Sequence, residues 1–433
     1  MRLRSVLIAI ALLASLPAHA DSWVARYAQL RPEVQQACNR HDLVACHSGL
    51  LELARLLDDR QDVLYKLARV EAELGLTGLA LQRLEIYARS GLDLGDPSTE
   101  PAFAALRQNV AFGRIVDLYR ASGKAAVVAH ARIATLGDSD LVAEDIVCNR
   151  GGGSFLVSSV RQRKVLQVGA SGGVSDLITQ QRVPLWGVFA LAEDPHRETL
   201  WATTATSAVS PPYTPQEADR SAVFALDRRS GAVLARYELA GGERHAFGDM
   251  TVAPDGTVYI SDGLGGGIYT VRPVAGPRLE TLVEPGNLGS PQTPALSRDG
   301  STLLVPDYQR GIARVALRRR SVSWLQRPPE LALFGIDGMY LEGRTLVAIQ
   351  NGTAPERIVM LRLNRTLDRV ESWRVLLARV PGLGDPTHGC LRRGDFYFIA
   401  NSGWDQFDDD GARTAGAVLT APEIWRIRIP APP

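Results

Sequence analysis

One phrase recurs through the later part of the chain, and its repetition constrains the fold more than any other feature. The phrase is an apolar stretch, a turn containing Gly or Asp, and a second apolar stretch, as in GDMTVAPDGTVYISD at residues 248–262. Such a phrase predicts two short β-strands joined by a tight turn. Copies of it begin at Glu144, Leu185, Phe247, Gln292, Ile336 and Thr387.

The spacing of these copies predicts the architecture. Their second strands recur roughly 43 to 58 residues apart, which is the period of a four-stranded propeller blade and not of a helical solenoid. A third apolar stretch follows each copy, as in KVLQVGA at residues 164–170 and EIWRIRI at residues 423–429. Six copies therefore predict a six-bladed β-propeller over residues 127–433.

The last blade runs out of chain just after its third strand, at residues 423–429. Residues 127–137, VVAHARIATLG, are rich in β-forming residues and precede the first blade. We expect them to pair with residues 423–429, because a ring closed in this way has no unpaired edge. The same closure makes Cys148 and Cys390 neighbours. Whether they bond stays open, since a disulfide requires Cα atoms within about 7 Å.

Residues 21–123 have a helical pattern instead. The segment DVLYKLARVEAELGLTGLALQRLEIYARSG at residues 62–91 has apolar or small residues at helical spacing, and Gly75 and Gly78 mark a turn between two helices. This spacing resembles the tetratricopeptide repeat. Two roles stay open: a cap that shields one side of the propeller, and a groove that binds a protein partner. The predicted fold class is therefore α + β multidomain, with an all-α helical-repeat domain over residues 21–123 before an all-β propeller.

The start of the chain predicts export. Residues 1–20 contain two arginines, an apolar run and a small-residue ending, Ala18-His19-Ala20, which is the pattern of a secretory signal peptide. The apolar run is shorter than the approximately 20 residues that a membrane span needs. We expect a soluble periplasmic or secreted protein beginning near Asp21, with an uncleaved anchor as the alternative.

Charge and cysteine content narrow the class further. The formal net charge of +1 in 433 residues gives no general attraction to nucleic acid or to an anionic membrane. Four cysteines in an exported chain allow three pairings. Cys38 and Cys46 are close together in one short segment that is expected to be helical, so the sequence favours a local disulfide between them.

The repeated phrases resemble the SMP-30/gluconolactonase/LRE-like propellers. The resemblance is carried by acidic or amide residues at the start of the inner strands, by PDG or RDG at the next turn, and most closely by GIDGMYLEGRTLVAIQNG at residues 335–352. The related NHL-type propellers share the pattern of PDGTVYISD, so this motif by itself indicates only the wider group of propellers. In the family that the chain resembles, oxygen ligands from different blades hold one divalent cation, usually calcium, on the axis.

The resemblance implies a set of site residues. Glu144, Gln292 and Asp337 correspond to the family's metal ligands in the first, fourth and fifth blades, and Gln292 stands where the family has asparagine. The family's third-blade asparagine corresponds to Gly248, which has no side-chain oxygen, with Asp249 next to it. Asp249, His388 and Trp186 are the expected substrate-binding residues at the same axial end, and Asp337 is the expected catalytic base.

Two functions stay open at this point. The first is a divalent-metal-dependent, calcium-type hydrolase that opens a small-molecule lactone or ester, and the retained Glu144 and Asp337 favour it. The second is a non-catalytic propeller that, with its helical repeats, binds a protein or another ligand of the cell envelope. The loss of the third-blade asparagine and the attached helical region favour this second function.

Overall fold

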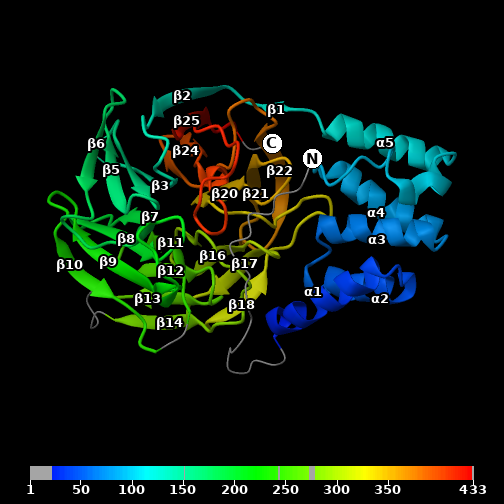
Figure 1. Cartoon of the computed structure of the whole chain (residues 1–433), viewed down its shortest axis with the longest axis horizontal. Helices are drawn as coiled ribbons and strands as arrows, with labels where there is room; N and C mark the ends of the chain where they lie inside the picture. The colour runs from blue at the N-terminus through cyan, green and yellow to red at the C-terminus, as the bar shows by residue number, and fades with distance from the viewer. Residues whose placement is uncertain (1–21, 151, 242–243, 273–277, 432–433) are drawn as a thin grey trace.

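The computed structural model describes residues 22–431 with gaps at residue 151, residues 242–243 and residues 273–277. The predicted signal peptide lies outside these described residues. A helical region comes first along the chain, and six sheets follow it in a ring (Figure 1). The predicted six-bladed propeller with a helical region before it is confirmed.

The helical region has capped, amphipathic helices. Ser22, Asp42 and Asn109 each accept a hydrogen bond from the first turn of the helix that follows them, which satisfies a backbone donor that the helix leaves free. Gly75 ends one helix with a φ of +74°. The elements are α1 (Trp23–Asn39), α2 (Leu43–Leu56), α3 (Gln61–Glu73), α4 (Thr77–Arg89), the 3-10 helix η1 (Pro101–Leu106) and α5 (Val110–Ser122).

A disulfide joins Cys38 to Cys46, the pair that the sequence favours. The expectation that both cysteines lie in one helical segment is wrong in detail, because Cys38 lies near the end of α1 and Cys46 lies in α2. The chain turns between the two helices at residues 40–42, where His41 has a φ of +58°. The bridge therefore joins two helices across a tight turn.

Each blade is an antiparallel sheet whose own strands run in chain order from the axis outward, and blades 5 and 6 each have a further outer strand from the segment before blade 1. Blade 1 contains β3 (Ala143–Cys148), β4 (Phe155–Ser159), β5 (Lys164–Val168) and β6 (Val174–Ile178), and blade 2 contains β7 (Gly187–Glu193), β8 (Thr199–Ala205), β9 (Ser221–Asp227) and β10 (Val233–Tyr237). Blade 3 contains β11 (Phe247–Val252), β12 (Val258–Asp262), β13 (Ile268–Val271) and β14 (Leu279–Val283), and blade 4 contains β15 (Ala295–Leu296), β16 (Thr302–Asp307), β17 (Gly311–Ala316) and β18 (Ser321–Trp324). Blade 5 contains β19 (Met339–Glu342), β20 (Thr345–Gln350), β21 (Arg357–Leu363) and β22 (Val370–Ala378), and blade 6 contains β23 (Gly389–Arg392), β24 (Asp395–Asn401) and β25 (Glu423–Arg428). Two further 3-10 helices, η2 (Pro215–Glu217) and η3 (Trp404–Gln406), lie in the connections β8–β9 and β24–β25.

Burial follows the position of a strand within its blade. All five residues of β4 are buried, because neighbouring blades cover both faces of a middle strand, whereas β6 at the rim has three exposed residues. Apolar clusters between adjacent blades form most of the propeller core, as where Leu156 and Val165 of blade 1 pack with Leu200 and Phe224 of blade 2. The sequence therefore has nearly continuous apolar runs in its middle strands and mixed runs at the rim.

The ring closes near the predicted seam. The strand β2 (His130–Thr135) pairs antiparallel with β25 and supplies the outer strand of blade 6, with His130 opposite Ile427 and Thr135 opposite Glu423. One part of the prediction is wrong: β1 (Ala126–Val127) pairs with β22 of blade 5, so Val127 lies opposite Leu377. The segment passes from the edge of one blade to the next, and Val128 continues the blade 5 pairing through Leu376.

Cys148 and Cys390 form a second disulfide across this seam, with their Cα atoms 5.7 Å apart. They occupy the inner strands β3 and β23, which belong to the first and last blades. The ring is therefore closed by strand pairing at its rim and by a covalent bond near its axis.

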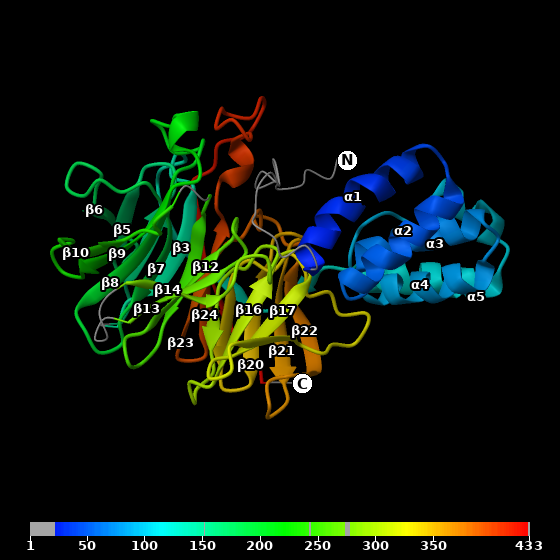
Figure 2. The ribbon, with the colours of Figure 1, turned by 90° about the horizontal axis from the view of Figure 1, so that it is seen from below.

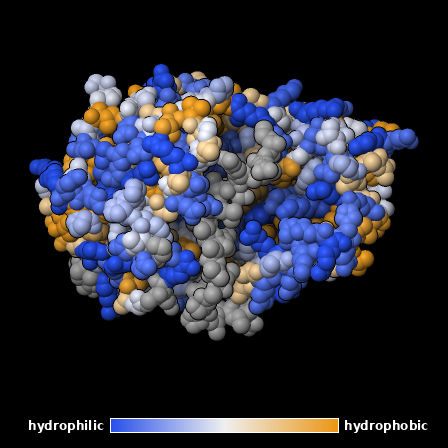
Figure 3. Space-filling view, in the orientation of Figure 1, coloured by the Kyte–Doolittle hydropathy of each residue, from blue (hydrophilic) through white to orange (hydrophobic). Residues whose placement is uncertain are grey.

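The helical region packs against blades 4 and 5, as Figure 2 shows from the side. Ala332 and Phe334, from the connection between these blades, lie in one apolar cluster with residues of α3, α4 and α5. Figure 3 shows one face of the whole molecule, on which hydrophilic residues predominate and hydrophobic residues lie in small separate groups.

Among the described residues, none of the helices combines the length and the apolar character that crossing a lipid bilayer requires.

Candidate functional site

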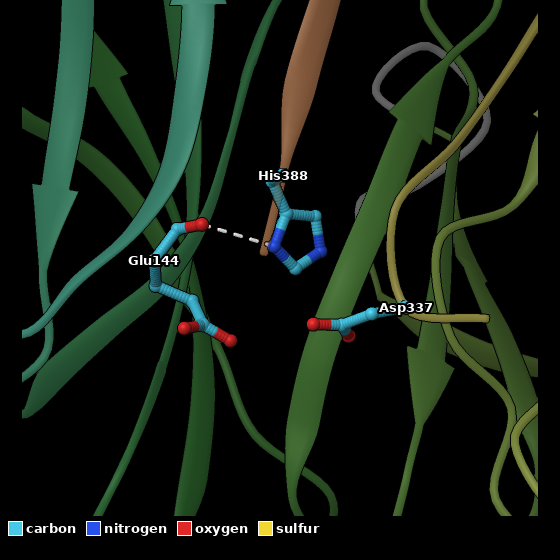
Figure 4. Close-up of side chains that lie close together, drawn as sticks. All are labelled: Glu144, Asp337 and His388. Atoms are coloured by element: carbon cyan, nitrogen blue, oxygen red, sulfur yellow. Dashed lines mark hydrogen bonds between the residues drawn. The ribbon is translucent and has the colours of Figure 1, made fainter. Parts of the chain in front are cut away.

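The candidate site lies on the propeller axis, where inner strands of different blades begin. Glu144 lies on β3 and Asp249 on β11, while Asp337 and His388 lie just before β19 and β23. Inner strands of a propeller converge on the axis, so residues at their first positions meet although the chain separates them. Figure 4 shows the side chains of Glu144, Asp337 and His388 approaching one another from three separate segments of the chain.

These three residues form the candidate metal site. One ligand atom from each of Glu144, Asp337 and His388 lies within 4.8 Å of the other two. All three side chains are buried. The geometry therefore brings together two of the three predicted ligands, and it adds His388, which the sequence placed among the substrate-binding residues.

The ring of His388 is hydrogen-bonded at both nitrogens. Its Nδ1 lies 3.0 Å from the backbone oxygen of Glu144, and its Nε2 lies 2.5 Å from Oδ1 of Asp249. Burial alone would lower the pKa of His388, but the carboxylates of Asp249 and Asp337 outweigh burial and raise that pKa well above the ordinary histidine value. This shift favours the imidazolium form, in which both nitrogens donate, one to a carbonyl and one to a carboxylate. Asp249 also accepts from Oγ1 of Thr293 at 3.1 Å.

Neutral donors orient the two other carboxylates. The indole Nε1 of Trp404 donates to Oε2 of Glu144 at 2.5 Å. The amide Nδ2 of Asn351 donates to Oδ2 of Asp337 at 2.7 Å, and the hydroxyl of Tyr308 donates to Oδ1 of Asn351 at 3.0 Å. None of these three donors is predicted from the sequence. Asn351 lies within the segment that carries the family resemblance, whereas Trp404 and Tyr308 lie in connections that had no signal of their own.

The surroundings raise the pKa values of the buried carboxyl groups. Burial, and then the Asp337 carboxylate, raise the pKa of Glu144 well above its ordinary value. Burial raises the pKa of Asp337 to about 6, against the opposing effect of His388. Asp337 can therefore change its protonation state close to neutral pH, as a general base must.

Asp145 is a further acidic residue that the sequence analysis did not select. Its carboxylate accepts from the backbone N–H of Leu191 and from its own neighbour, Ile146, each at 2.7 Å. Burial raises the pKa of Asp145 to about 6. Since its bonds tie β3 to β7, Asp145 joins the first two blades beside the site.

The amide positions differ from the implied family pattern. The Nε2 of Gln292 donates to Oγ of Ser290 at 3.0 Å, so its nitrogen is engaged within its own loop. A Cβ added at Gly248 would meet no atom within 4 Å, so this position leaves open space where a side chain would fit. The backbone oxygen of Gly248 accepts from Oγ1 of Thr203 instead.

Trp186 is the third expected substrate-binding residue. Its ring packs beneath the guanidinium groups of Arg220 and Arg236, at 4.8 and 5.1 Å from the ring centre. Arg236 belongs to β10, the outermost strand of blade 2. The ring of Trp186 therefore packs against these cations and the apolar core between blades 1 and 2, and it is not among the residues that border the axial cavity with Asp249 and His388.

A cavity of about 310 Å³ lies along the axis next to the site. Asp249 and His388 border it together with Tyr340, and the Cys148–Cys390 disulfide lines it farther along the inner strands. The His388–Asp249 pair therefore borders both the carboxylate cluster and this cavity.

Comparison with protein-family models gave no match, and comparison with curated proteins gave none either. Among solved structures, the chain is similar to regucalcin of Agrobacterium tumefaciens, described as a calcium-binding protein, with 17% identity, a TM-score of 0.48, and coverage of 71% of this chain and 96% of that one. It is similar to a luciferin-regenerating enzyme with 12% identity, a TM-score of 0.48, and coverage of 69% and 94%. It is similar to a gluconolactonase of Xanthomonas campestris with 17% identity, a TM-score of 0.44, and coverage of 71% and 98%. It is also similar to a virginiamycin B lyase of Staphylococcus aureus, with 13% identity, a TM-score of 0.43, and coverage of 62% and 81%. The chain's own six sheets establish the six-bladed propeller.

Proposed function

We propose that the protein is a divalent-cation-dependent hydrolase that opens a lactone or a related ester at the propeller axis. The observation that carries this proposal is the convergence of Glu144, Asp337 and His388, whose ligand atoms lie within 4.8 Å of one another. Two buried carboxylates at this separation repel each other when both are ionised, and a bound cation removes that repulsion.

The donor set fits a divalent cation but not the usual calcium set. Calcium takes six to eight oxygen ligands, whereas Gly248 supplies no side-chain oxygen here. An imidazole beside two carboxylates suits manganese or zinc as well. His388 can become a ligand only by releasing one of its two ring protons, which lie on the hydrogen bonds to the Glu144 backbone oxygen and to Asp249. Calcium, which the family resemblance implies, is therefore to be tested beside these two ions.

Each axial residue has a separate role in the proposed hydrolysis. Glu144 and Asp337 would hold the cation, which when bound polarises the substrate carbonyl. Asp337 accepts the proton of the attacking water, and Asn351 fixes one of its oxygens for this role. When the cation takes only the two carboxylates as ligands, the imidazolium of His388 would supply a buried positive charge that favours the negative charge developing on the substrate.

Titration of the purified protein tests the cation site directly. We expect calorimetry with Ca²⁺, Mn²⁺ and Zn²⁺, each added alone, to detect one strong site, and the tightest ion to support hydrolysis on a panel of sugar and acyl lactones. The absence of both binding and turnover with all three ions would overturn the proposal.

A non-catalytic binding propeller is the second candidate. The observation that favours it is the His388–Asp249 pair, because an imidazolium already offsets carboxylate charge at the place where a cation would do so. In that case the axial residues would contribute to stability, and the helical region or the propeller face would bind a protein or another ligand of the cell envelope. This function predicts a stable protein without cation binding.

We also propose that the protein is exported to the periplasm or secreted. All four cysteines belong to disulfides, which persist in oxidising compartments. Thiol counting on protein purified from its native compartment, under denaturing and non-reducing conditions, should find none. Four free thiols would contradict export to an oxidising compartment.

A further inference from the structure

The carboxylate of Asp337 is oriented through a short chain of neutral groups. Asn351 donates to Asp337, and Tyr308 donates to Asn351. Tyr308 lies in the turn between β16 and β17, and Asn351 directly follows β20. Backbone hydrogen bonds join these segments. The N–H of Gly335 donates to the backbone oxygen of Tyr308 at 2.8 Å, and the N–H of Gly352 donates to the backbone oxygen of Gly335 at 3.1 Å.

The helical region holds the segment that follows Asn351. The guanidinium of Arg357 donates through Nε to Oε1 of Gln350 and through Nη1 to the backbone oxygen of Ser90, at the end of α4, each at 2.8 Å. Gln350 donates to the backbone oxygen of Phe334, three residues before Asp337, at 2.8 Å. The backbone N–H of Asp93 donates to the oxygen of Ala354 at 2.5 Å.

The helical region also holds the turn that carries Tyr308. Nη1 of Arg60 donates to the backbone oxygen of Gln309 at 2.8 Å, and Asp62 fixes the orientation of Arg60 through two hydrogen bonds. The next residue in the turn, Arg310, places its guanidinium 5.2 Å from the ring centre of Trp23 on α1. Helices therefore contact this turn from two directions.

Arg357 is unusual in its surroundings. Its side chain is 1% exposed, its hydrogen-bond partners are neutral, and one nitrogen, Nη2, has no partner among the described residues. Burial lowers its pKa to about 10. A guanidinium buried without an anion costs stability, so an apolar side chain would serve simple domain packing better. Its two bonds instead fix the geometry of the Gln350–Asn351 segment.

We propose that the helical region is a positioning element of the axial site, which holds Tyr308 and Asn351 so that they orient the Asp337 carboxylate. Tyr308 and Asn351 are then positioning residues, and Arg357 and Arg60 transmit the support of the helices to them. Only the cation-binding part of the test below rests on the proposed function.

Hydrogen exchange separates this role from ordinary domain docking. Arg357→Met removes the link to Gln350 and Ser90, whereas Arg327→Met removes another contact across the same interface, with Asp58, together with the bonds of Arg327 to its own connection at residues 328–331. We expect the peptide over residues 348–353 to exchange about tenfold faster in Arg357→Met only, with β8 and β9 unchanged in both variants. Equal exchange in both variants, or none altered, would overturn the proposal. If Arg357→Met fails to fold, Arg60→Met tests the same idea at residues 304–311.

Tyr308→Phe tests the positioning of Asp337 itself, with Tyr237→Phe on β10 as the matched control. We expect a crystal structure of Tyr308→Phe to show Asn351 turned away from Asp337, and we expect Mn²⁺ affinity to fall about tenfold, as for other groups that orient metal ligands. An unchanged Asn351–Asp337 bond would overturn the proposal. A wild-type protein that binds no Mn²⁺ would count against the cation site alone, because the exchange and crystallographic results do not depend on it.

Discussion

Asp337 combines burial, an orienting amide and a nearby imidazolium in a single side chain. Asn351 holds one of its oxygens, and Figure 4 shows a carboxylate oxygen directed toward Glu144 and His388. With its pKa raised to about 6, it is mostly ionised at neutral pH and still able to accept a proton. The residue thus has the position and the acidity that the proposed general base requires.

Replacing Asp337 by Asn keeps the shape and removes the charge. We expect lactone turnover in Asp337→Asn to fall by on the order of a hundredfold or more, because a general base is lost. Cation affinity should fall with it, since one of two anionic ligands becomes neutral. Steady-state kinetics and calorimetry measure the two effects, and Asp176→Asn on the rim strand β6 is the control. Full turnover in Asp337→Asn would exclude this residue as the base.

Asp385 provides a pH-dependent contribution to stability near the site. Burial, and then Glu356, raise the pKa of Asp385 to about 8, so the folded protein keeps this carboxyl protonated at neutral pH. The unfolded chain releases that proton near pH 4. Between these values the folded state binds more protons, so stability falls as pH rises, by up to about 1.4 kcal/mol per pH unit for this group.

The variant Asp385→Asn removes this titration and keeps a side chain that Ser402 can still contact. We expect the loss of stability between about pH 4 and pH 8 to be shallower in Asp385→Asn than in the wild type. Denaturant unfolding at several pH values measures the slope. Parallel pH profiles for the two proteins would contradict the assignment.

At the scale of elements, the ring is closed by β2 and by the Cys148–Cys390 disulfide. That disulfide joins residues 242 positions apart, whereas Cys38 and Cys46 are 8 positions apart. A cross-link across a longer loop removes more entropy from the unfolded chain. The seam therefore gains stability from a bond that the pairing of β2 with β25 alone does not supply.

Removing each disulfide in turn tests this difference. We expect the double variant Cys148→Ala/Cys390→Ala to lose about 3 kcal/mol more stability than Cys38→Ala/Cys46→Ala, by the loop-length dependence. Denaturant midpoints under non-reducing conditions give the comparison. A larger loss for the helical pair would show that local packing, and not ring closure, determines the contribution.

At the scale of the whole molecule, the helices and the propeller form one packed body. Phe334 and Ala332 of the propeller lie in the core of the helical region, and Arg357 is buried at the contact. A chain that begins at Lys124 would expose all three. We expect it to melt at a lower temperature than the full chain and to aggregate, since exposing one buried Phe costs about 1.5–3 kcal/mol. An unchanged melting temperature would show that the propeller is independent of the helices.

The sequence by itself determined the architecture and part of the site. Period and pattern are local properties, so the repeated strand–turn–strand phrases predict six blades, and the shortage of one outer strand predicts closure by the segment before blade 1, which β2 provides. The family resemblance selected Glu144 in the first blade and Asp337 in the fifth, and these residues meet at the axis. These features were readable because strand period and residue type do not depend on distant contacts.

Only the tertiary structure decided how the remaining side chains are used. His388 belongs to the cluster because Asp249, 139 positions away in the chain, binds its ring. The ring of Trp186 packs under the guanidinium groups of Arg220 and Arg236 and does not border the axial cavity. The segment at residues 126–127 joins blade 5 because its backbone lies along the otherwise free edge of β22. The roles of Trp404, Tyr308 and Arg357 depend in the same way on contacts between segments far apart in the chain, which local sequence patterns do not encode.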